Sequence, residues 1–171
     1  VLPQTPQNPM THVTIKKWGV RFFLGAASFV LIVSWLLGGA LTAPAHRPVP
    51  SPSGLAVRDI ELKSEAGARC AAWYLQHHRT NPDSPQTTII LAHPIRSNRL
   101  SMLGRAEFFS RLGCSVLMLD LQAHGESSGD HITFGHLERH DVAAAVEFVR
   151  QSTPHDKIAV LGVSLGGAAA V

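Results

Sequence analysis

Hydrophobic and polar positions change their spacing several times along the chain, and each spacing predicts a different element. From Phe22 to Ala45 there are 24 consecutive residues without a charge or a histidine. Twenty helical residues span about 30 Å, the thickness of the hydrocarbon core of a bilayer. A core helix of a soluble domain would show a polar face, and this segment shows none. The pattern therefore predicts a transmembrane helix or signal anchor over residues 22–43, after an N-terminal tail at 1–21.

A cleaved signal peptide is the alternative interpretation of the same segment. Ala43-Pro44-Ala45 offers small residues at an A-x-A spacing, but the apolar run is longer than the usual signal-peptide core of about 7 to 15 residues. Lys16, Lys17 and Arg21 precede the run and only Arg47 follows closely, so the charge bias predicts a cytoplasmic N-terminus. We expect a single-pass membrane protein with its folded domain on the outer side.

Proline-rich segments flank the apolar run. Residues 1–9 are polar and proline-rich, and Met10 is an alternative start of the protein. Residues 44–54 carry four prolines and end in Ser53-Gly54, a composition typical of a stiff, extended linker. Beyond it, residues 55–171 are predicted to form the folded domain.

Short β-type runs alternate with helical patterns after the linker. Residues 58–63 alternate in polarity and residues 70–76 form a second run after Gly67, which predicts a hairpin. Three later runs are continuously apolar, as in strands covered on both faces of a parallel sheet: residues 87–92, 115–121 and 157–163.

Helical spacing joins these apolar runs. It covers residues 102–112, closed by Gly113, and residues 135–150, while residues 81–85 predict a loop. Strands that alternate with helices form right-handed βαβ units. The predicted fold class is therefore α/β: a hairpin leading into parallel strands with flanking helices, preceded by one transmembrane helix.

Charge and cysteine content narrow the function classes. The chain of 171 residues is 45% hydrophobic and 16% charged, with a formal net charge of +3. Residues 1–47 carry +4, so residues 48–171 carry −1 and lack the basic face that a nucleic-acid binder needs. Two cysteines cannot form a disulfide framework. We expect no nucleic-acid partner.

The motif that carries chemistry is Gly162-Val163-Ser164-Leu165-Gly166, a G-x-S-x-G. An apolar strand enters it and a helix start rich in small residues leaves it, which is the setting of a nucleophile elbow. A serine on such a tight turn projects its hydroxyl above the sheet, and the flanking glycines let neighbouring backbone approach. Ser164 is therefore the candidate nucleophile; the alternative is a tight strand-to-helix turn without chemistry.

Three motifs in chain order resemble the N-terminal half of an α/β-hydrolase. They are Ala92-His93-Pro94, the loop Asp120–Ser127 and the elbow, each following a predicted strand. The resemblance covers about the last two-thirds of the chain. It points to bacterial hydrolases related to monoacylglycerol lipases and to serine aminopeptidase-like enzymes.

This resemblance implies roles for individual residues. Ser164 would be the nucleophile, and the backbone N–H of Leu165 would be one oxyanion donor. In the family the residue after a His-Gly pair supplies the second donor, and the resemblance of His93-Pro94 to that pair implies the N–H of Ile95; Pro94 itself has no N–H. The loop Asp120–Ser127 resembles the family's D-x-R-G-H-G-x-S, and we interpret it as structural support beside the site.

The general base and acid of the family follow the serine in the chain. The seven residues after Ser164 contain no Asp, Glu or His, and recruiting His93 or His124 would break the family's order. With so little helix after the elbow, the strands at 115–121 and 157–163 would keep an uncovered face. We interpret the sequence as a C-terminally truncated fragment and predict that the fragment alone turns over no substrate.

Other signals are weaker. His136 and His140 have a zinc-compatible spacing but lack the H-E-x-x-H order and a third ligand, so a solvated helix face is the better interpretation and we expect no metal. No glycine-rich nucleotide motif is present, so we expect no cofactor. Arg96, Asn98 and Arg99 are interpreted as solvated loop and helix-capping residues rather than contacts to an acidic substrate group.

Together these patterns predict a membrane-anchored serine hydrolase. It would act on an ester, thioester or amide bond of a small-molecule or peptide substrate through an acyl-enzyme on Ser164, with the lipid bilayer as its other partner. The alternative is a non-catalytic membrane protein with a degenerate, hydrolase-like interaction domain.

Overall fold

A computed structural model describes residues 10–78 and 86–171, with side-chain exposure from Trp18 onward. The proline-rich residues 1–9 and the loop predicted at 81–85 lie outside the described residues. The chain forms two compact units, Val1–Leu41 and Thr42–Val171.

The described part of the first unit is one long helix, α1 (Met10–Thr42), whose last residue already belongs to the second unit. Its segment Trp18–Thr42 has a mean hydropathy of 2.0 and none of it is buried. Large apolar side chains are exposed all round it, including Phe22 at 80% and Trp35 at 78%. The helix is therefore long and apolar enough to cross a membrane, a property that signal sequences share.

The second unit is built on a mixed sheet in the order β2-β3-β5-β4-β7. The antiparallel part comprises β2 (Arg58–Lys63), β3 (Arg69–Leu75) and β5 (Ser115–Leu119). On the other side of β5, β4 (Thr87–Ala92) and β7 (Lys157–Gly162) run parallel to it. A separate parallel pair joins β1 (Ala45–His46) to β6 (His124–Gly125). The predicted hairpin and parallel strands are confirmed.

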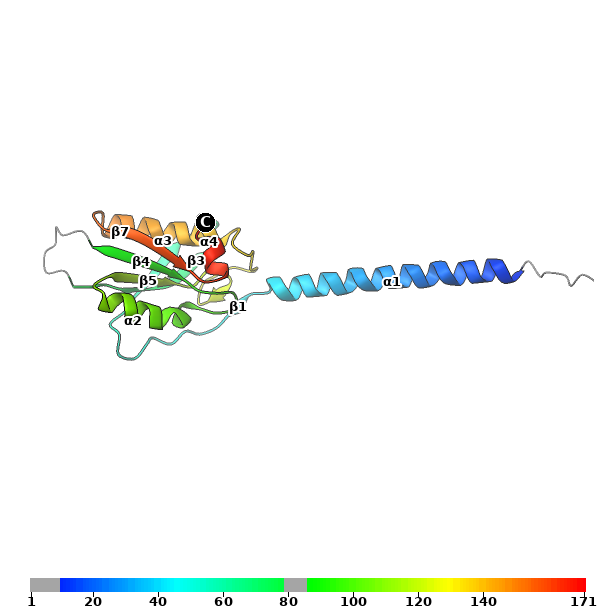
Figure 1. Ribbon diagram of the computed structural model, residues 1–171, viewed down its shortest axis with the longest axis horizontal. Helices are drawn as coiled ribbons and strands as arrows, with labels where there is room; N and C mark the ends of the chain where they lie inside the picture. Colours follow the sequence, from blue (N-terminus) through cyan, green and yellow to red (C-terminus); the bar gives the residue numbers. More distant parts are fainter. Residues whose placement is uncertain (1–9, 79–85) are drawn as a thin grey trace, which may run out of the picture. The chain divides into compact units, whose positions relative to one another are not determined.

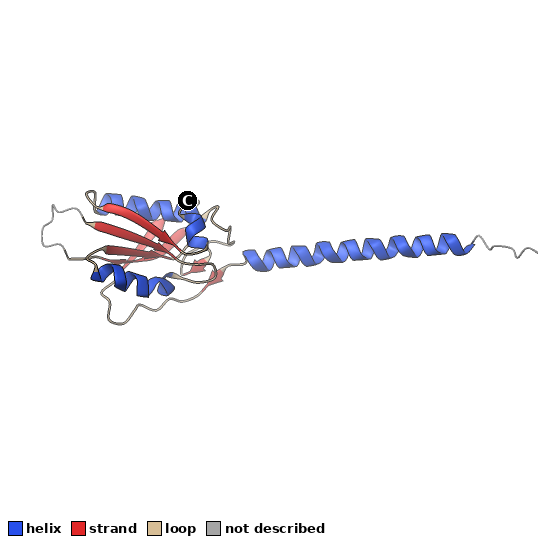
Figure 2. Ribbon diagram, in the orientation of Figure 1, coloured by secondary structure: helices blue, strands red, loops and turns tan. Residues whose placement is uncertain are grey.

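Helices cover both faces of this sheet (Figures 1 and 2). A 3₁₀ turn, η1 (Arg99–Met102), leads into α2 (Leu103–Arg111) on one face. On the other face lie α3 (Glu138–Ser152) and the short α4 (Leu165–Ala169). Successive side chains of β4 point to opposite faces, so Leu91 packs in the core under α2 and Ile90 in the core under α3. The α/β architecture is confirmed.

Two predicted elements end earlier or begin later than the sequence indicated, because side chains take over their backbone hydrogen bonds. The strand predicted at 115–121 stops at Leu119, since Leu121 N–H donates to His93 Nε2 (3.1 Å) and leaves the ladder. The helix predicted from 135 begins at Glu138, whose carboxylate accepts from the N–H groups of Thr133 (2.7 Å) and Gly135 (2.8 Å).

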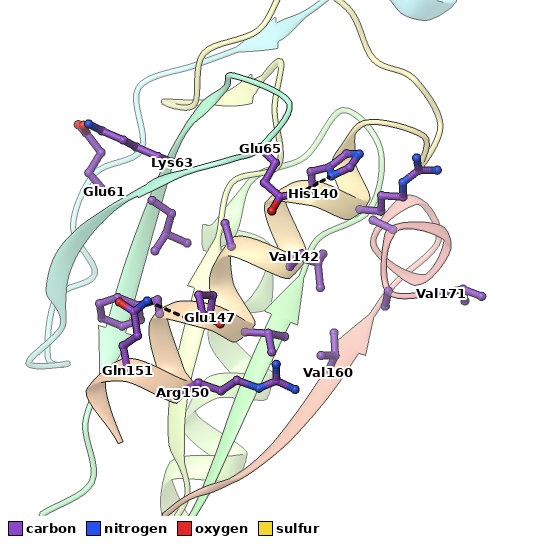
Figure 3. A pocket seen from close by; sticks show the side chains of 18 residues that line it. Glu61, Lys63, Glu65, His140, Val142, Glu147, Arg150, Gln151, Val160 and Val171 are labelled. Carbon is purple, nitrogen blue, oxygen red and sulfur yellow. Dashed lines mark hydrogen bonds and ion pairs between the residues drawn. The ribbon is translucent and has the colours of Figure 1, made fainter. Parts of the chain in front are cut away.

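The prediction of uncovered strands holds for one of the two strands only. All five residues of β5 are buried, so the expectation for residues 115–121 was wrong: α2 and α3 pack over its two faces. In β7, every residue is exposed or half-buried. Beside β7 lies a groove of about 920 Å³ that α3, β2 and α4 line, and Figure 3 shows Val160 and Val171 along it.

The segment predicted as a linker belongs to the second unit, where it contacts the loop Asp120–Ser127. Ala45 N–H donates to the carbonyl of Ala123 (2.7 Å), and Val49, which is 5% exposed, donates its N–H to Glu126 Oε1 (3.1 Å). Four prolines lower the backbone entropy that this contact costs, because their φ angles are already fixed.

The burial difference between β4 and β7 gives a stability prediction. Ile90→Ala removes a fully buried side chain from the central strand, and we expect a loss of about 2–5 kcal/mol of unfolding free energy. Val160→Ala on β7 is the control; Val160 is 36% exposed and should lose far less. Thermal unfolding of both variants in detergent measures this, and equal losses would contradict the burial described for the two strands.

Candidate active site

The backbone around Ser164 forms a sharp turn between β7 and α4. Ser164 has φ of 52° and ψ of −111°, a conformation that costs a residue other than glycine about 1–3 kcal/mol. A Cβ on Gly162 would overlap the carbonyl of Gly166, and a Cβ on Gly166 would overlap the carbonyl of Ala92. Only glycine fits at these two positions, so the geometric expectation for the G-x-S-x-G motif is met.

The turn is fastened to the end of the neighbouring strand. Val163 N–H donates to the carbonyl of Ala92 (3.1 Å), the last residue of β4. Ser164 is exposed, whereas Leu165, the first residue of α4, is 5% exposed and packs into the core. The elbow and the loop after β4 therefore meet at the carboxyl edge of the parallel strands, where α/β proteins place their ligands.

The loop after β4 makes a second tight turn. Ser97 N–H donates to the carbonyl of Pro94 (3.2 Å), and Arg96, the third residue of the turn, has φ of 57°. A positive φ at that position is typical of a type II turn, which fixes the residue before it, here Ile95. The hydrogen bonds found over residues 10–78 and 86–171 include none donated by the backbone N–H of Ile95 or Leu165.

Buried His93 has both ring nitrogens engaged. Nδ1 lies 2.8 Å from the carbonyl of Pro94 and donates to it, and Nε2 accepts the N–H of Leu121 at 3.1 Å. Burial lowers the pKa of His93 from 6.5 to about 4. A neutral imidazole whose lone pair is occupied cannot accept a proton from Ser164, so His93 positions the loop after β4.

His124 stacks edge-on against His93, with ring centroids 5.0 Å apart. It is fully buried, and its Nδ1 lies 2.8 Å from the carbonyl of Gln122, to which it donates. Burial also lowers the pKa of His124. The two imidazoles form a neutral packing layer beneath the carboxyl edge.

The loop after β5 is held by a buried ion-pair network. Arg99, 2% exposed, pairs with Asp120 and with Glu126 Oε2 (2.5 Å), while its guanidinium lies over the Trp73 ring at 4.4 Å. Asp120 also accepts the N–H groups of Arg99 (2.6 Å) and Glu126 (2.9 Å). Burial raises the pKa of Asp120 above its ordinary value, and these hydrogen bonds and Arg99 act against that rise.

These contacts test the roles assigned to the polar loops. Ser127 Oγ donates to the carbonyl of Asp120 (2.7 Å) and accepts Ala71 N–H (2.9 Å), so the loop Asp120–Ser127 satisfies itself and the neighbouring strand. Asn98 caps η1, as expected. The expectation of a solvated Arg99 was wrong, because its guanidinium is buried in ion pairs with the carboxylates of Asp120 and Glu126. The sequence feature that could have indicated a buried partner for Arg99 is the position of Asp120 directly after an apolar strand.

The groove beside β7 and the histidines of α3 are separate features. None of Ser164, Ile95 and Leu165 lines the groove beside β7. His140 on α3 has Nδ1 3.7 Å from Glu65 Oε2 (Figure 3). Within the described part of the chain, no three His, Cys, Asp or Glu residues gather in a group that could hold a metal ion.

Comparisons with known proteins agree with this geometry. Residues 83–171, just over half of the chain, match the family described as "Serine aminopeptidase, S33". The chain therefore belongs to this family of α/β-hydrolases.

Individual relatives extend the match beyond the family segment. The uncharacterized protein YqkD of Bacillus subtilis is 32% identical over 96 residues, which cover 56% of this chain and 31% of YqkD. The α/β-hydrolase domain-containing protein WAV2 of Arabidopsis thaliana is 32% identical over 124 residues, covering 70% of this chain and 38% of WAV2. The esterase Pf2001 of Pyrococcus furiosus superposes with a TM-score of 0.64 at 27% identity, over 74% of this chain and 51% of the esterase. The chain thus spans about a third to a half of these relatives.

The close backbone approach at the elbow can be tested by adding one methyl group. In Gly166→Ala the new Cβ would overlap the Ala92 carbonyl, and we expect a loss of about 1–3 kcal/mol or more from overpacking. Gly167→Ala is the matched control, since its Cβ would meet its nearest neighbour, the carbonyl of Gly162, at an ordinary 3.5 Å. Thermal unfolding compares the two, and a Gly166→Ala variant as stable as Gly167→Ala would refute the contact.

Burial of neutral His93 predicts a pH dependence of stability. Its folded pKa, about 4, lies below the ordinary value of 6.5, so the unfolded chain binds more protons between these values. The contribution of neutral His93 to the free energy of unfolding is complete above pH 6.5. It is lost as the pH falls toward 4, by up to about 3 kcal/mol. Unfolding free energies of the protein and of His93→Gln across this range measure it; parallel pH curves for the two would contradict it.

Proposed function

We propose that this protein is a serine hydrolase that cleaves an ester, thioester or amide through an acyl-enzyme on Ser164. The observation that carries the proposal is the strained, exposed position of Ser164 on a turn whose positions 162 and 166 accommodate only glycine. Membership of the α/β-hydrolase family and the likeness to an esterase of 27% identity support it. Of the three bond types, the ester is the one that this likeness to an esterase supports.

The chemical step follows from the geometry of the carboxyl edge. Ser164 Oγ attacks the carbonyl carbon of the substrate, and its proton passes to a general base. The backbone N–H groups of Leu165 and Ile95 donate to the negative oxygen that forms. The leaving group departs with the proton, and water then releases the acid from the serine by the reverse sequence.

The general base is not one of the two buried histidines at this edge. His93 already accepts a hydrogen bond at Nε2, its unprotonated nitrogen, and His124 is fully buried with a lowered pKa. We propose that the base and its acid partner lie outside the 171 residues, which span about half of the esterase that they resemble.

We further propose that α1 anchors the enzyme in a membrane. Its segment Trp18–Thr42 has the length and hydropathy of a spanning helix. Lys16, Lys17 and Arg21 lie before the apolar run and favour a cytoplasmic N-terminus, with the hydrolase domain on the outer side. The substrate is a small molecule or a peptide.

A fluorophosphonate probe tests the nucleophile in the complete protein as the cell makes it. The probe should label wild-type protein on Ser164, and Ser164→Ala should abolish labelling, because phosphonylation needs an activated hydroxyl. Ser101→Ala, at another exposed serine, is the control and should label normally. Labelling that survives in Ser164→Ala refutes the assignment. A folded wild-type protein that takes up no probe favours a non-catalytic, interaction domain instead.

A further inference from the structure

The junction between the apolar helix and the second unit lies at the same sheet edge as Ser164. Thr42 is the last residue of the apolar segment and belongs to the second unit. Its carbonyl accepts the N–H of Ile132 (2.8 Å), a fully buried residue in the loop between β6 and α3. The position of Thr42 within the second unit is therefore fixed, whatever direction α1 takes.

The loop at 130–135, called the rim loop here, presents an aromatic side chain two residues beyond this hydrogen bond. Phe134 is 53% exposed and has φ of 54°. A bulky residue rarely adopts a positive φ, which costs about 1–3 kcal/mol. The rim loop thus presents a large, half-exposed apolar ring in spite of this backbone cost.

Buried Glu138 holds the rim loop in this conformation from both sides of Phe134. Its carboxylate accepts the N–H and the Oγ1–H of Thr133 (2.7 and 2.6 Å) and the N–H of Gly135 (2.8 Å). Three hydrogen bonds to one fully buried carboxylate make the loop a rigid support. These hydrogen bonds fix the backbone on both sides of Phe134 and with it the direction in which its ring leaves the loop.

The rim loop also touches the helix that Ser164 begins. A Cβ on Gly135 would lie 3.0 Å from Ala168 Cβ and 3.2 Å from the Ala168 carbonyl oxygen. Ala168 N–H in turn donates to the carbonyl of Ser164 (3.0 Å), so one helical turn, a rise of about 5.4 Å, separates the contact from the nucleophile. A continuous path of contacts leads from Thr42 through the rim loop to Ser164.

We infer that the rim loop lies at the bilayer surface, with Phe134 in the interfacial layer, and that Ser164 acts on an amphiphile residing in that bilayer. The end of a spanning helix lies at the interface, so Thr42 and its hydrogen-bond partner Ile132 would lie there, and Phe134 follows Ile132 by two residues. Aromatic rings are favoured in that layer. The substrate class is an ester with a long acyl or alkyl chain that stays in the membrane while its carbonyl reaches Ser164. The position of the rim loop rests on the proposed membrane anchor, and the substrate class rests in addition on the proposed nucleophile.

Fluorescence quenching tests the position of the rim loop without any need for activity. The full chain carries Cys114→Ser, and Cys70 is buried, so a fluorophore can be attached to Phe134→Cys or, separately, to His131→Cys. The labelled protein is reconstituted into phosphatidylcholine vesicles that contain lipids with a nitroxide on the headgroup. Phe108→Cys on α2 is the matched control, because Phe108 is also 53% exposed.

We expect quenching several-fold stronger at positions 134 and 131 than at 108. Equal quenching at the three positions overturns the inference, and so does a chain that fails to float with the vesicles. The His131 label keeps the test decisive if Phe134→Cys does not fold.

The substrate class is tested by surface dilution in the complete, reconstituted enzyme. A long-chain ester is held at constant bulk concentration while unlabelled phosphatidylcholine lowers its mole fraction in the vesicles. The rate should fall with the mole fraction if substrate comes from the bilayer, whereas a rate that follows the bulk concentration overturns the substrate class. Absence of both hydrolysis and phosphonate labelling at Ser164 refutes the proposed function, and the quenching result then stands separately.

Discussion

The contact between the elbow and the end of β4 is the constraint on which the candidate site depends. The Ala92 carbonyl accepts the N–H of Val163 and leaves room for hydrogen alone at the α-carbon of Gly166. This contact joins the start of α4 to the end of β4, and the loop after β4 contains Ile95. The strain at Ser164 persists because both sides of the turn are fixed in this way. The candidate nucleophile and the candidate oxyanion donors therefore belong to one rigid contact rather than to two independent loops.

Buried carboxylates provide the second level of support. Asp120 holds η1 and the loop after β5 through Arg99, and Glu138 holds the rim loop. Each carboxylate is fully buried and accepts several hydrogen bonds, which offsets the cost of removing it from water. Burial acts to raise the pKa of Glu138, but the hydrogen bonds from Thr133 and Gly135 outweigh it and lower the pKa. The loops at the carboxyl edge are thus rigid without a large apolar core of their own.

Local patterns predicted most of the sheet but not the polar network. The apolar run at 87–92 coincides with β4, since a strand buried on both faces has a continuous apolar signature. The end of β5 was misplaced because His93, 28 residues away, takes the N–H of Leu121. The G-x-S-x-G motif identified the elbow, since its spacing is local. Arg99 and the rim loop escaped prediction because their partners lie far along the chain or in side-chain contacts that no spacing reveals.

The topology explains why Thr42, the last residue of the apolar helix, lies at the same sheet edge as Ser164. β6 follows directly from the carboxyl end of β5, and β1 pairs with β6 in parallel. Any helix that precedes β1 by two residues must then end near the carboxyl ends of β4, β5 and β7, since these strands are parallel. Ala45 and Thr42 are held there by hydrogen bonds to Ala123 and Ile132. The proposed position of Ser164 at a bilayer therefore depends on the pairing of only two residues, Ala45 and His46, with β6, because this pairing holds Thr42 at the same edge as Ser164.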